Sequence, residues 1–170
     1  PFNHLYHQGT ITKDGSKMSK SKGNTVSPDI FVEKYGSDTF RCYLMFMGPY
    51  DEGGDWNDKG IKGINKFLGR SFRLASVGTK YNESNEDLFT IHSTIKSVTE
   101  SLEKLKFNTA LSRLMEFVNY FYSRGLNENT KSIYIRLLSP FAPHLAEELW
   151  SENNLSLIHI SEPTRRVRLS

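Results

Sequence analysis

The amino-acid sequence predicts a mainly α fold in which a small α/β part with one β-hairpin is followed by a helical connector and an α-helix bundle. Two observations carry this prediction. Apolar residues recur at helical spacing through the long stretches after residue 59, and the clearest β-hairpin pattern lies near the N-terminus. Hydrophobic residues make up 37% of the chain, which is enough to build a packed core.

The N-terminal residues predict a short helix followed by the β-hairpin. We expect residues 2–7 to form the helix, with His4 and His7 as surface or packing residues rather than catalytic ones. The hairpin spans Gly9 to Ser19. Its turn contains the Asp14-Gly15 pair, which tolerates the positive φ angles that a tight hairpin turn requires.

A loop over residues 20–26 leads to two short helices. Ser27-Pro28 suits the N-cap and the first position of a helix, and Gly36 is placed to end that helix in a left-handed conformation. We expect Ser37 to cap the second helix, which extends to Met47.

An acidic, glycine-rich stretch separates these helices from the rest of the chain. Residues 50–58 are predicted to form a loop in which Trp56 packs the connector against the first part. The apolar residues of a helix over residues 59–75 share one face. The opposite face is cationic: Lys59, Lys62, Lys66, Arg70 and Arg73. Such a face is either ordinary solvated surface or a track for a nucleic-acid backbone.

Polar residues 78–87 predict a linker to three further helices. Their expected ranges are 88–105, 109–124 and 128–150, the last with a break near Pro140 and Pro143. Asn108 is expected to cap the second of these helices and Gly125 to end it. We interpret His144 as a capping or buried hydrogen-bonded residue.

The composition excludes several classes of protein. Cys42 is the single cysteine, so no disulfide framework or cysteine-based zinc site can form within the chain, and we expect no protein-bound metal. No apolar stretch approaches the roughly 20 residues of a membrane-spanning helix, so we expect a cytoplasmic protein with no membrane partner. The formal net charge of +3 lies largely in residues 155–170, so it says little about partners.

The most informative stretch is KMSKSKGN at residues 17–24. Lysines and serines alternate in it: Lys17, Ser19, Lys20, Ser21 and Lys22. The lysines repel one another, so we expect the loop to be poorly held without an anion. Ammonium and hydroxyl groups in this arrangement suit a polyphosphate whose negative charge moves onto a leaving group. The alternative is an ordinary solvated surface loop.

KMSKS is the second signature of the class I aminoacyl-tRNA synthetases, and the sequence around it resembles the leucyl branch of that family over residues 1 to about 154. The matching stretches are KMSKSKGN, SPDIFVEKYGSDTFR (27–41), MFMGP (45–49), Trp56, GIKGINKFLGR (60–70), KFNTALSRLMEFVN (106–119) and LSPFAPHLAEELW (138–150). KMSKSKGN and the YG-x-D-x-x-R part of the second stretch are shared with valyl, isoleucyl and methionyl relatives. Those enzymes therefore remain alternatives, as does a stand-alone helical RNA-binding module.

The resemblance implies an ATP-dependent leucine–tRNA ligase, which activates leucine to leucyl-adenylate and transfers it to tRNA(Leu). Lys17 and Lys20 would then be catalytic, with Lys20 stabilising the pyrophosphate leaving group and Lys17 supporting it. Met18 would anchor the loop. ATP, carried with Mg²⁺, would contact the whole loop: Lys17, Met18, Ser19, Lys20, Ser21 and Lys22. The cationic face of residues 59–73 would contact tRNA.

The same resemblance implies a domain plan. Residues 1–76 would be the C-terminal end of a Rossmann-type α/β catalytic domain with its helical connector, and residues 77–154 a helix-bundle tRNA (anticodon-type) binding domain. Residues 155–170 are interpreted as a non-native tail, because LSLIHISEPTR resembles a translated sequencing adapter; a short strand with a basic tail is the alternative. The His-x-Gly-His signature of the family has no counterpart here, so we expect an incomplete enzyme, inactive alone, from a monomeric parent.

Overall fold

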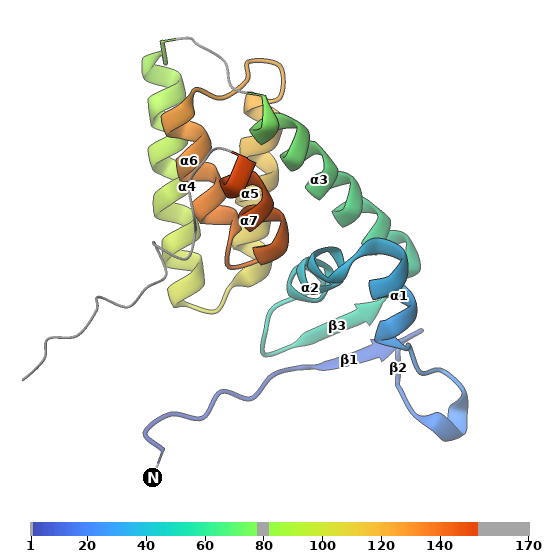
Figure 1. Cartoon of the computed structure of the whole chain (residues 1–170). Coiled ribbons are helices and arrows are strands. Elements are labelled where there is room, and N and C mark those ends of the chain that lie inside the picture. Colours follow the sequence, from blue (N-terminus) through green and yellow to red (C-terminus); the bar gives the residue numbers. More distant parts are fainter. Residues whose placement is uncertain (1, 78–81, 153–170) are drawn as a thin grey trace, which may run out of the picture.

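The computed structural model describes residues 2–77 and 82–152, and it places a small sheet at one end of a mainly helical molecule (Figure 1). The strands are β1 (Thr10–Lys13), β2 (Ser16–Lys17) and β3 (Gly53–Trp56). Near the sheet lie the 3₁₀ turn η1 (Lys20–Lys22) and the helices α1 (Pro28–Tyr35) and α2 (Ser37–Phe46). The remaining helices are α3 (Asp58–Ser76), α4 (Asn85–Glu103), α5 (Phe107–Phe121), α6 (Glu128–Leu138) and α7 (Pro143–Glu152). This arrangement confirms the predicted fold class.

The β-hairpin forms as predicted. Strand β1 pairs antiparallel with β2, and Thr12 lies opposite Lys17. At the turn, Asp14 and Gly15 take positive φ angles of 52° and 69°. The lysine loop therefore leaves the sheet directly from a tight turn and a two-residue strand.

Strand β3 corrects the expectation of a loop throughout residues 50–58. It pairs in parallel with β1, which places Asp55 beside Thr12 and gives the sheet the order β2-β1-β3. A Cβ atom on Gly53 would lie 2.3 Å from the backbone oxygen of Thr10, and the φ angle of Gly53 is 83°. In the sequence Gly53 suggested a loop. In the structure a glycine is required there because the backbones of β1 and β3 approach closely.

The helix expected over residues 2–7 is not formed. These residues are exposed, and the side chains of Phe2 and Leu5 are among the most accessible apolar groups, at 87% and 91%. A single helical turn or two is unstable in water unless it packs against other elements. The sequence pattern alone does not provide that packing.

Two predicted helix caps are also corrected. Gly36, with a φ angle of 84°, occupies the N-cap position of α2, so Ser37 is the first helical residue instead. The Ser37 hydroxyl lies 3.3 Å from Nδ1 of His144, a partner far along the chain. Helix α5 begins before Asn108, with Lys106 at its N-cap position.

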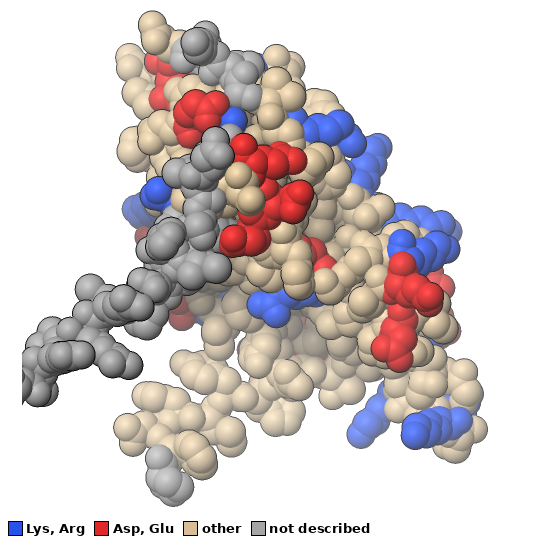
Figure 2. Space-filling model, in the orientation of Figure 1, with Lys and Arg blue, Asp and Glu red and all other residues tan. Residues whose placement is uncertain are grey.

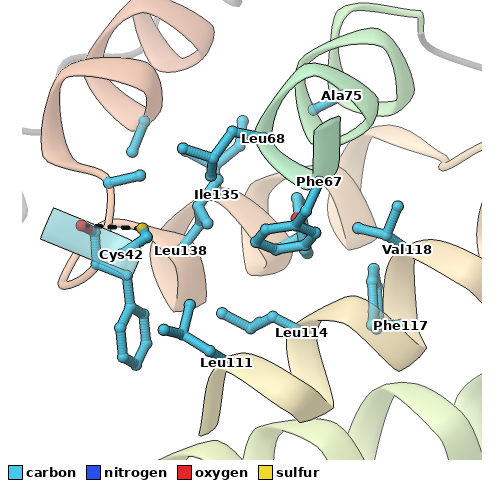
Figure 3. Packing of buried hydrophobic residues seen from close by; sticks show 14 of the residues in the cluster. Cys42, Phe67, Leu68, Ala75, Leu111, Leu114, Phe117, Val118, Ile135 and Leu138 are labelled. Carbon is cyan, nitrogen blue, oxygen red and sulfur yellow. Dashed lines mark hydrogen bonds between the residues drawn. The ribbon is translucent and has the colours of Figure 1, made fainter. Parts of the chain in front are cut away.

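One hydrophobic core connects α2, α3 and the bundle (Figure 3). Its fully buried members include Ile61, Ile64, Leu111, Leu114, Phe117, Phe121, Tyr134, Ile135, Leu138 and Leu149. The buried Tyr134 hydroxyl donates a hydrogen bond to Ser71 Oγ at 2.7 Å, and Ser71 donates in turn to the Phe67 carbonyl at 3.0 Å. These two buried hydroxyl groups are therefore hydrogen-bonded inside the core, where an unpaired polar group is costly.

Cys42 belongs to this core on the α2 side. Its thiol donates to the Phe141 carbonyl at 3.4 Å, and burial raises the pKa of the thiol to about 12. Because α2 also packs against α3 and α5, the part that carries the sheet is joined to the bundle through buried contacts.

Two sequence predictions lie outside the described residues. They are the first part of the linker, residues 78–81, and the tail, residues 155–170. Within the ranges 2–77 and 82–152, no helix is long and apolar enough to cross a lipid bilayer.

Candidate functional site

The lysine loop, residues 17–24, projects from the sheet end of the molecule (Figure 1). Figure 2 shows cationic side chains on this projecting tip, away from the bundle. Lys17, Lys20 and Lys22 are exposed, and none of them forms an ion pair with another described residue. Their ammonium groups are therefore open to an anion.

The loop is closed by its own neutral hydrogen bonds. The side-chain amide of Asn24 accepts from the Ser19 backbone N–H at 2.8 Å and donates to the Lys17 carbonyl at 3.3 Å. Ser19 Oγ accepts from the Lys22 backbone N–H at 3.3 Å and lies 3.1 Å from the Ser21 hydroxyl. This geometry differs from the expectation of a loop poorly held without an anion. Exposed charges are screened by solvent, so their repulsion is too weak to open these bonds.

Two further features set the shape of the loop. Met18 is half-buried and packs against the hydrophobic core, so it ties the loop to the body of the protein. Gly23 has a φ angle of 65°, in the left-handed region, and its backbone N–H donates to the Lys20 carbonyl. A residue with a side chain would be strained at this position.

Asp55 holds the hairpin from the neighbouring strand. Its Oδ1 accepts from the Thr12 hydroxyl at 2.5 Å and from the Gly15 backbone N–H at 3.0 Å. These two hydrogen bonds hold the pKa of the Asp55 carboxyl below its usual range, and the bond from Thr12 has the larger effect. Sequence reasoning missed both Asn24 and Asp55 as site residues. The contact between Asp55 and Gly15 joins residues 40 positions apart, and no local sequence pattern predicts it.

The predicted cationic face on α3 is present and runs along one edge of the molecule (Figure 2). Lys59, Lys62 and Lys66 are exposed, and no ion pair joins them to other residues that the structure describes. The two arginines of the face differ from these lysines, because both extend toward α5.

Arg70 and Arg73 converge on Tyr122 at the end of α5. The Arg70 guanidinium donates to Asn119 Oδ1 at 2.7 Å and lies 4.4 Å from the centre of the Tyr122 ring. Arg73 Nε donates to the Tyr122 hydroxyl at 3.2 Å, which lowers the pKa of that hydroxyl. The arginines thus have a packing role between α3 and α5, while the three lysines have their charges free for a partner.

Trp56 lies at the end of β3 and not in the predicted loop. Its buried ring contacts Phe31, Phe40 and Tyr43 of α1 and α2, with ring centroids 4.7 to 5.9 Å apart. This aromatic cluster fixes the end of β3 against the helices that follow the lysine loop. Among the described residues, no group of three or more His, Cys, Asp or Glu side chains is arranged to hold a metal ion.

Two protein families match the sequence. The family described as "tRNA synthetases class I (I, L, M and V)" matches residues 1–57. The family described as "Anticodon-binding domain of tRNA ligase" matches residues 88–166. The first match includes the hairpin, the lysine loop and β3, and the second includes the bundle.

Curated relatives are leucine–tRNA ligases. That of Clostridium perfringens is 46% identical over 172 residues, covering 89% of this chain and 21% of the ligase. That of Clostridium tetani is also 46% identical, covering 88% and 21%, and that of Pseudothermotoga lettingae is 40% identical, covering 92% and 22%. The chain therefore spans about a fifth of the length of the curated relatives it matches.

A solved structure has the same fold. It is the leucyl-tRNA synthetase agnB2 of Agrobacterium radiobacter K84, in a ternary complex with tRNA and LeuAMS. The match has a TM-score of 0.78 at 31% identity and covers 89% of this chain and 23% of that one.

The lysine loop, the helix bundle and these matches make the chain a homologue of the class I tRNA synthetases. Within that class it corresponds to one segment of the leucine–tRNA ligases, which confirms the leucyl resemblance. The valyl, isoleucyl and methionyl alternatives are not favoured, because the curated relatives that match the chain are leucine–tRNA ligases. A stand-alone RNA-binding module is not favoured either, because both families match one chain.

The role of Asn24 can be measured in the isolated chain. Replacing Asn24 with Ala removes both hydrogen bonds of the side-chain amide, each worth about 1 kcal/mol. We expect the Ser19 amide to exchange with deuterium about five to ten times faster. The Asn129→Ala variant, altered on the surface of α6, serves as the control and should leave Ser19 unchanged. Equal Ser19 exchange in the wild type and in Asn24→Ala contradicts the assignment.

The contact of Asp55 predicts a pH dependence. Because the folded pKa of Asp55 lies below its usual range, the carboxylate stabilises the fold at neutral pH, and this contribution is lost as the pH falls through the folded pKa. We expect the urea midpoint of Asp55→Asn to lie below that of the wild type at neutral pH and to converge with it below about pH 4. The Asp51→Asn variant is the control for surface charge. A gap that persists unchanged into acid argues against the contact.

Proposed function

We propose that the chain is the part of a leucine–tRNA ligase that meets the phosphates of ATP and one side of tRNA(Leu). The parent enzyme activates leucine to leucyl-adenylate and transfers the leucyl group to tRNA(Leu). The observation that carries the proposal is the lysine loop, whose ammonium groups extend from a backbone already closed by Asn24 and Ser19. A preorganised cationic turn of this kind favours charge that develops during a reaction.

The chemistry assigned to the loop is charge stabilisation. When the leucine carboxylate attacks the α-phosphorus of ATP, the bond to the bridging oxygen breaks and pyrophosphate leaves with additional negative charge. We assign Lys20 to that leaving group and Lys17 to a supporting position. Met18, Ser19, Ser21 and Lys22 complete the ATP contact. Mg²⁺ would be carried by the ATP phosphates and not by a site in this chain.

The bundle and α3 are assigned to tRNA. Lys59, Lys62 and Lys66 lie along one exposed helix face, which suits contact with successive backbone phosphates. Arg70 and Arg73 extend this face while they also bind Tyr122 and Asn119. In support, the chain matches an anticodon-binding family and a synthetase structure that contains tRNA.

The wider assignments are proposals of the same kind. We assign residues 1–76 to the end of the catalytic domain and residues 77–154 to the tRNA-binding bundle, in a parent enzyme that is monomeric and cytoplasmic. Because the chain spans 21% of the Clostridium perfringens ligase, we propose that it is inactive without the remaining domains. The non-native origin of residues 155–170 stays a prediction, and the anticodon-binding match extends to residue 166.

Lys20 is tested in a graft enzyme, defined as the Clostridium perfringens leucine–tRNA ligase with its matching segment replaced by residues 2–152 of this chain. A contact made only in the transition state contributes about 3 kcal/mol, so Lys20→Ala should slow leucine-dependent ATP–pyrophosphate exchange about a hundredfold. The affinity for leucine should change little. Lys34→Ala, which removes a nearby exposed lysine, is the matched control. Equal losses of rate and leucine affinity would falsify the role.

The cationic face is tested by the salt dependence of tRNA binding to the graft enzyme. The double variant Lys62→Ala and Lys66→Ala should weaken binding and make the slope of log affinity against log salt shallower by about one to two. The double variant Lys96→Ala and Lys104→Ala removes the same charge from α4 and the turn after it. The proposal is wrong for these lysines if both double variants change the slope equally.

A further inference from the structure

Helix α7 does not provide its own N-terminal cap. Its first residue, Pro143, follows Ala142, whose methyl side chain accepts no hydrogen bond. The first backbone N–H groups of a helix lack partners within the helix, and an N-cap side chain usually accepts from the N–H of the second or third helical residue. In α7 the third helical residue is Leu145.

Asp38 of α2, which is distant in the sequence but packs beside α7, takes this place. Its Oδ2 accepts from the Leu145 backbone N–H at 2.7 Å, and its Oδ1 lies 2.9 Å from Nδ1 of His144. The residues in contact are 107 positions apart in the sequence. A carboxylate at a helix N-terminus also interacts favourably with the helix dipole. Asp38 itself is 9% exposed, so its carboxylate needs these partners.

Neighbouring residues of α2 reach the same short connection between α6 and α7. An Arg41 guanidinium nitrogen donates to the Pro140 carbonyl at 3.1 Å, and the Cys42 thiol donates to the Phe141 carbonyl at 3.4 Å. One face of α2 is thus bonded to the start of α7. Other residues of α2, Phe40 and Tyr43, contact Trp56, which belongs to the same strand as Asp55.

We propose that Asp38 is a positioning residue, a cap supplied by the loop-bearing part that sets the orientation of the tRNA-binding bundle. This inference rests on the proposed function. We expect Asp38 to matter for the transfer of leucine to tRNA, because this step requires a fixed arrangement of tRNA and active site. Adenylate formation needs no tRNA contact from the bundle, so Asp38 has no part in it.

The first test uses the 170-residue chain and its two tryptophans, one in each part. Trp56→Phe leaves Trp150 of α7 as the reporter, and Trp150→Phe leaves Trp56 of β3. Trp150→Phe removes a buried indole N–H without a hydrogen-bond partner among the described residues, so this change breaks no such bond. Because each reporter chain carries its own tryptophan substitution, the shift caused by Asp38→Ala is measured within each reporter chain. Asp38→Ala should lower the Trp150 midpoint more than the Trp56 midpoint.

The second test uses the graft enzyme and compares two rates. Asp38→Ala should lower kcat/KM for charging tRNA about tenfold or more, as expected for losing hydrogen bonds to a charged group, and leave ATP–pyrophosphate exchange within about twofold. Asp38→Asn, which keeps one acceptor for Leu145, should be intermediate and covers the case in which the alanine variant does not fold. Glu33→Ala, an exposed carboxylate of α1, is the control and should match the wild type.

The outcomes separate this inference from the proposed function. Reporter midpoints that shift together, or equal losses of charging and exchange, overturn the role of Asp38. A Lys20→Ala enzyme that forms adenylate at the wild-type rate instead overturns the proposed function, and the tryptophan measurement still decides whether Asp38 joins the two parts.

Discussion

The packing of α2 between the sheet and the bundle is the contact on which the other features depend. Tyr43 fixes one side: its hydroxyl donates to the Asn57 carbonyl at 2.8 Å and accepts from the Asn57 N–H at 2.9 Å, at the junction of β3 and α3. Cys42 lies on the other side, buried against the connection to α7. Because this short helix is buried on two sides, side-chain packing around it holds the lysine loop and the bundle in one arrangement.

The lysine loop shows how a protein can present clustered positive charge at low cost. The hydrogen bonds that set its shape use neutral groups, the Asn24 amide, the Ser19 hydroxyl and backbone atoms, so no lysine is needed to hold the backbone. The ammonium groups stay in solvent, where their repulsion is screened. The loop therefore has a defined backbone and exposed charged tips, which suits a ligand whose charge distribution changes during a reaction.

The sequence predicted the elements that depend on local patterns. Helical periodicity predicted α3 to α6 within a few residues, cap residues predicted α1 and α2, and the Asp14-Gly15 pair predicted the hairpin turn. It failed for strand β3, because parallel pairing with β1 is non-local and its glycines have the composition of a loop. The same reason explains the missed site residues. His144 was expected to be hydrogen-bonded, yet its partner Asp38 is 106 residues away, and no spacing rule relates the two. Long-range pairs of this kind become visible only once the chain is folded.

The buried thiol of Cys42 has a consequence for the chemistry of the folded chain. Oxidants and alkylating reagents attack the thiolate, and a thiol with a pKa of about 12 is almost entirely protonated at physiological pH. With its sulfur also shielded from solvent, the one cysteine of the chain cannot act as a redox sensor in the folded state. Oxidative damage at this position can begin only after α2 has separated from the start of α7, so it would mark molecules that have already lost their native packing.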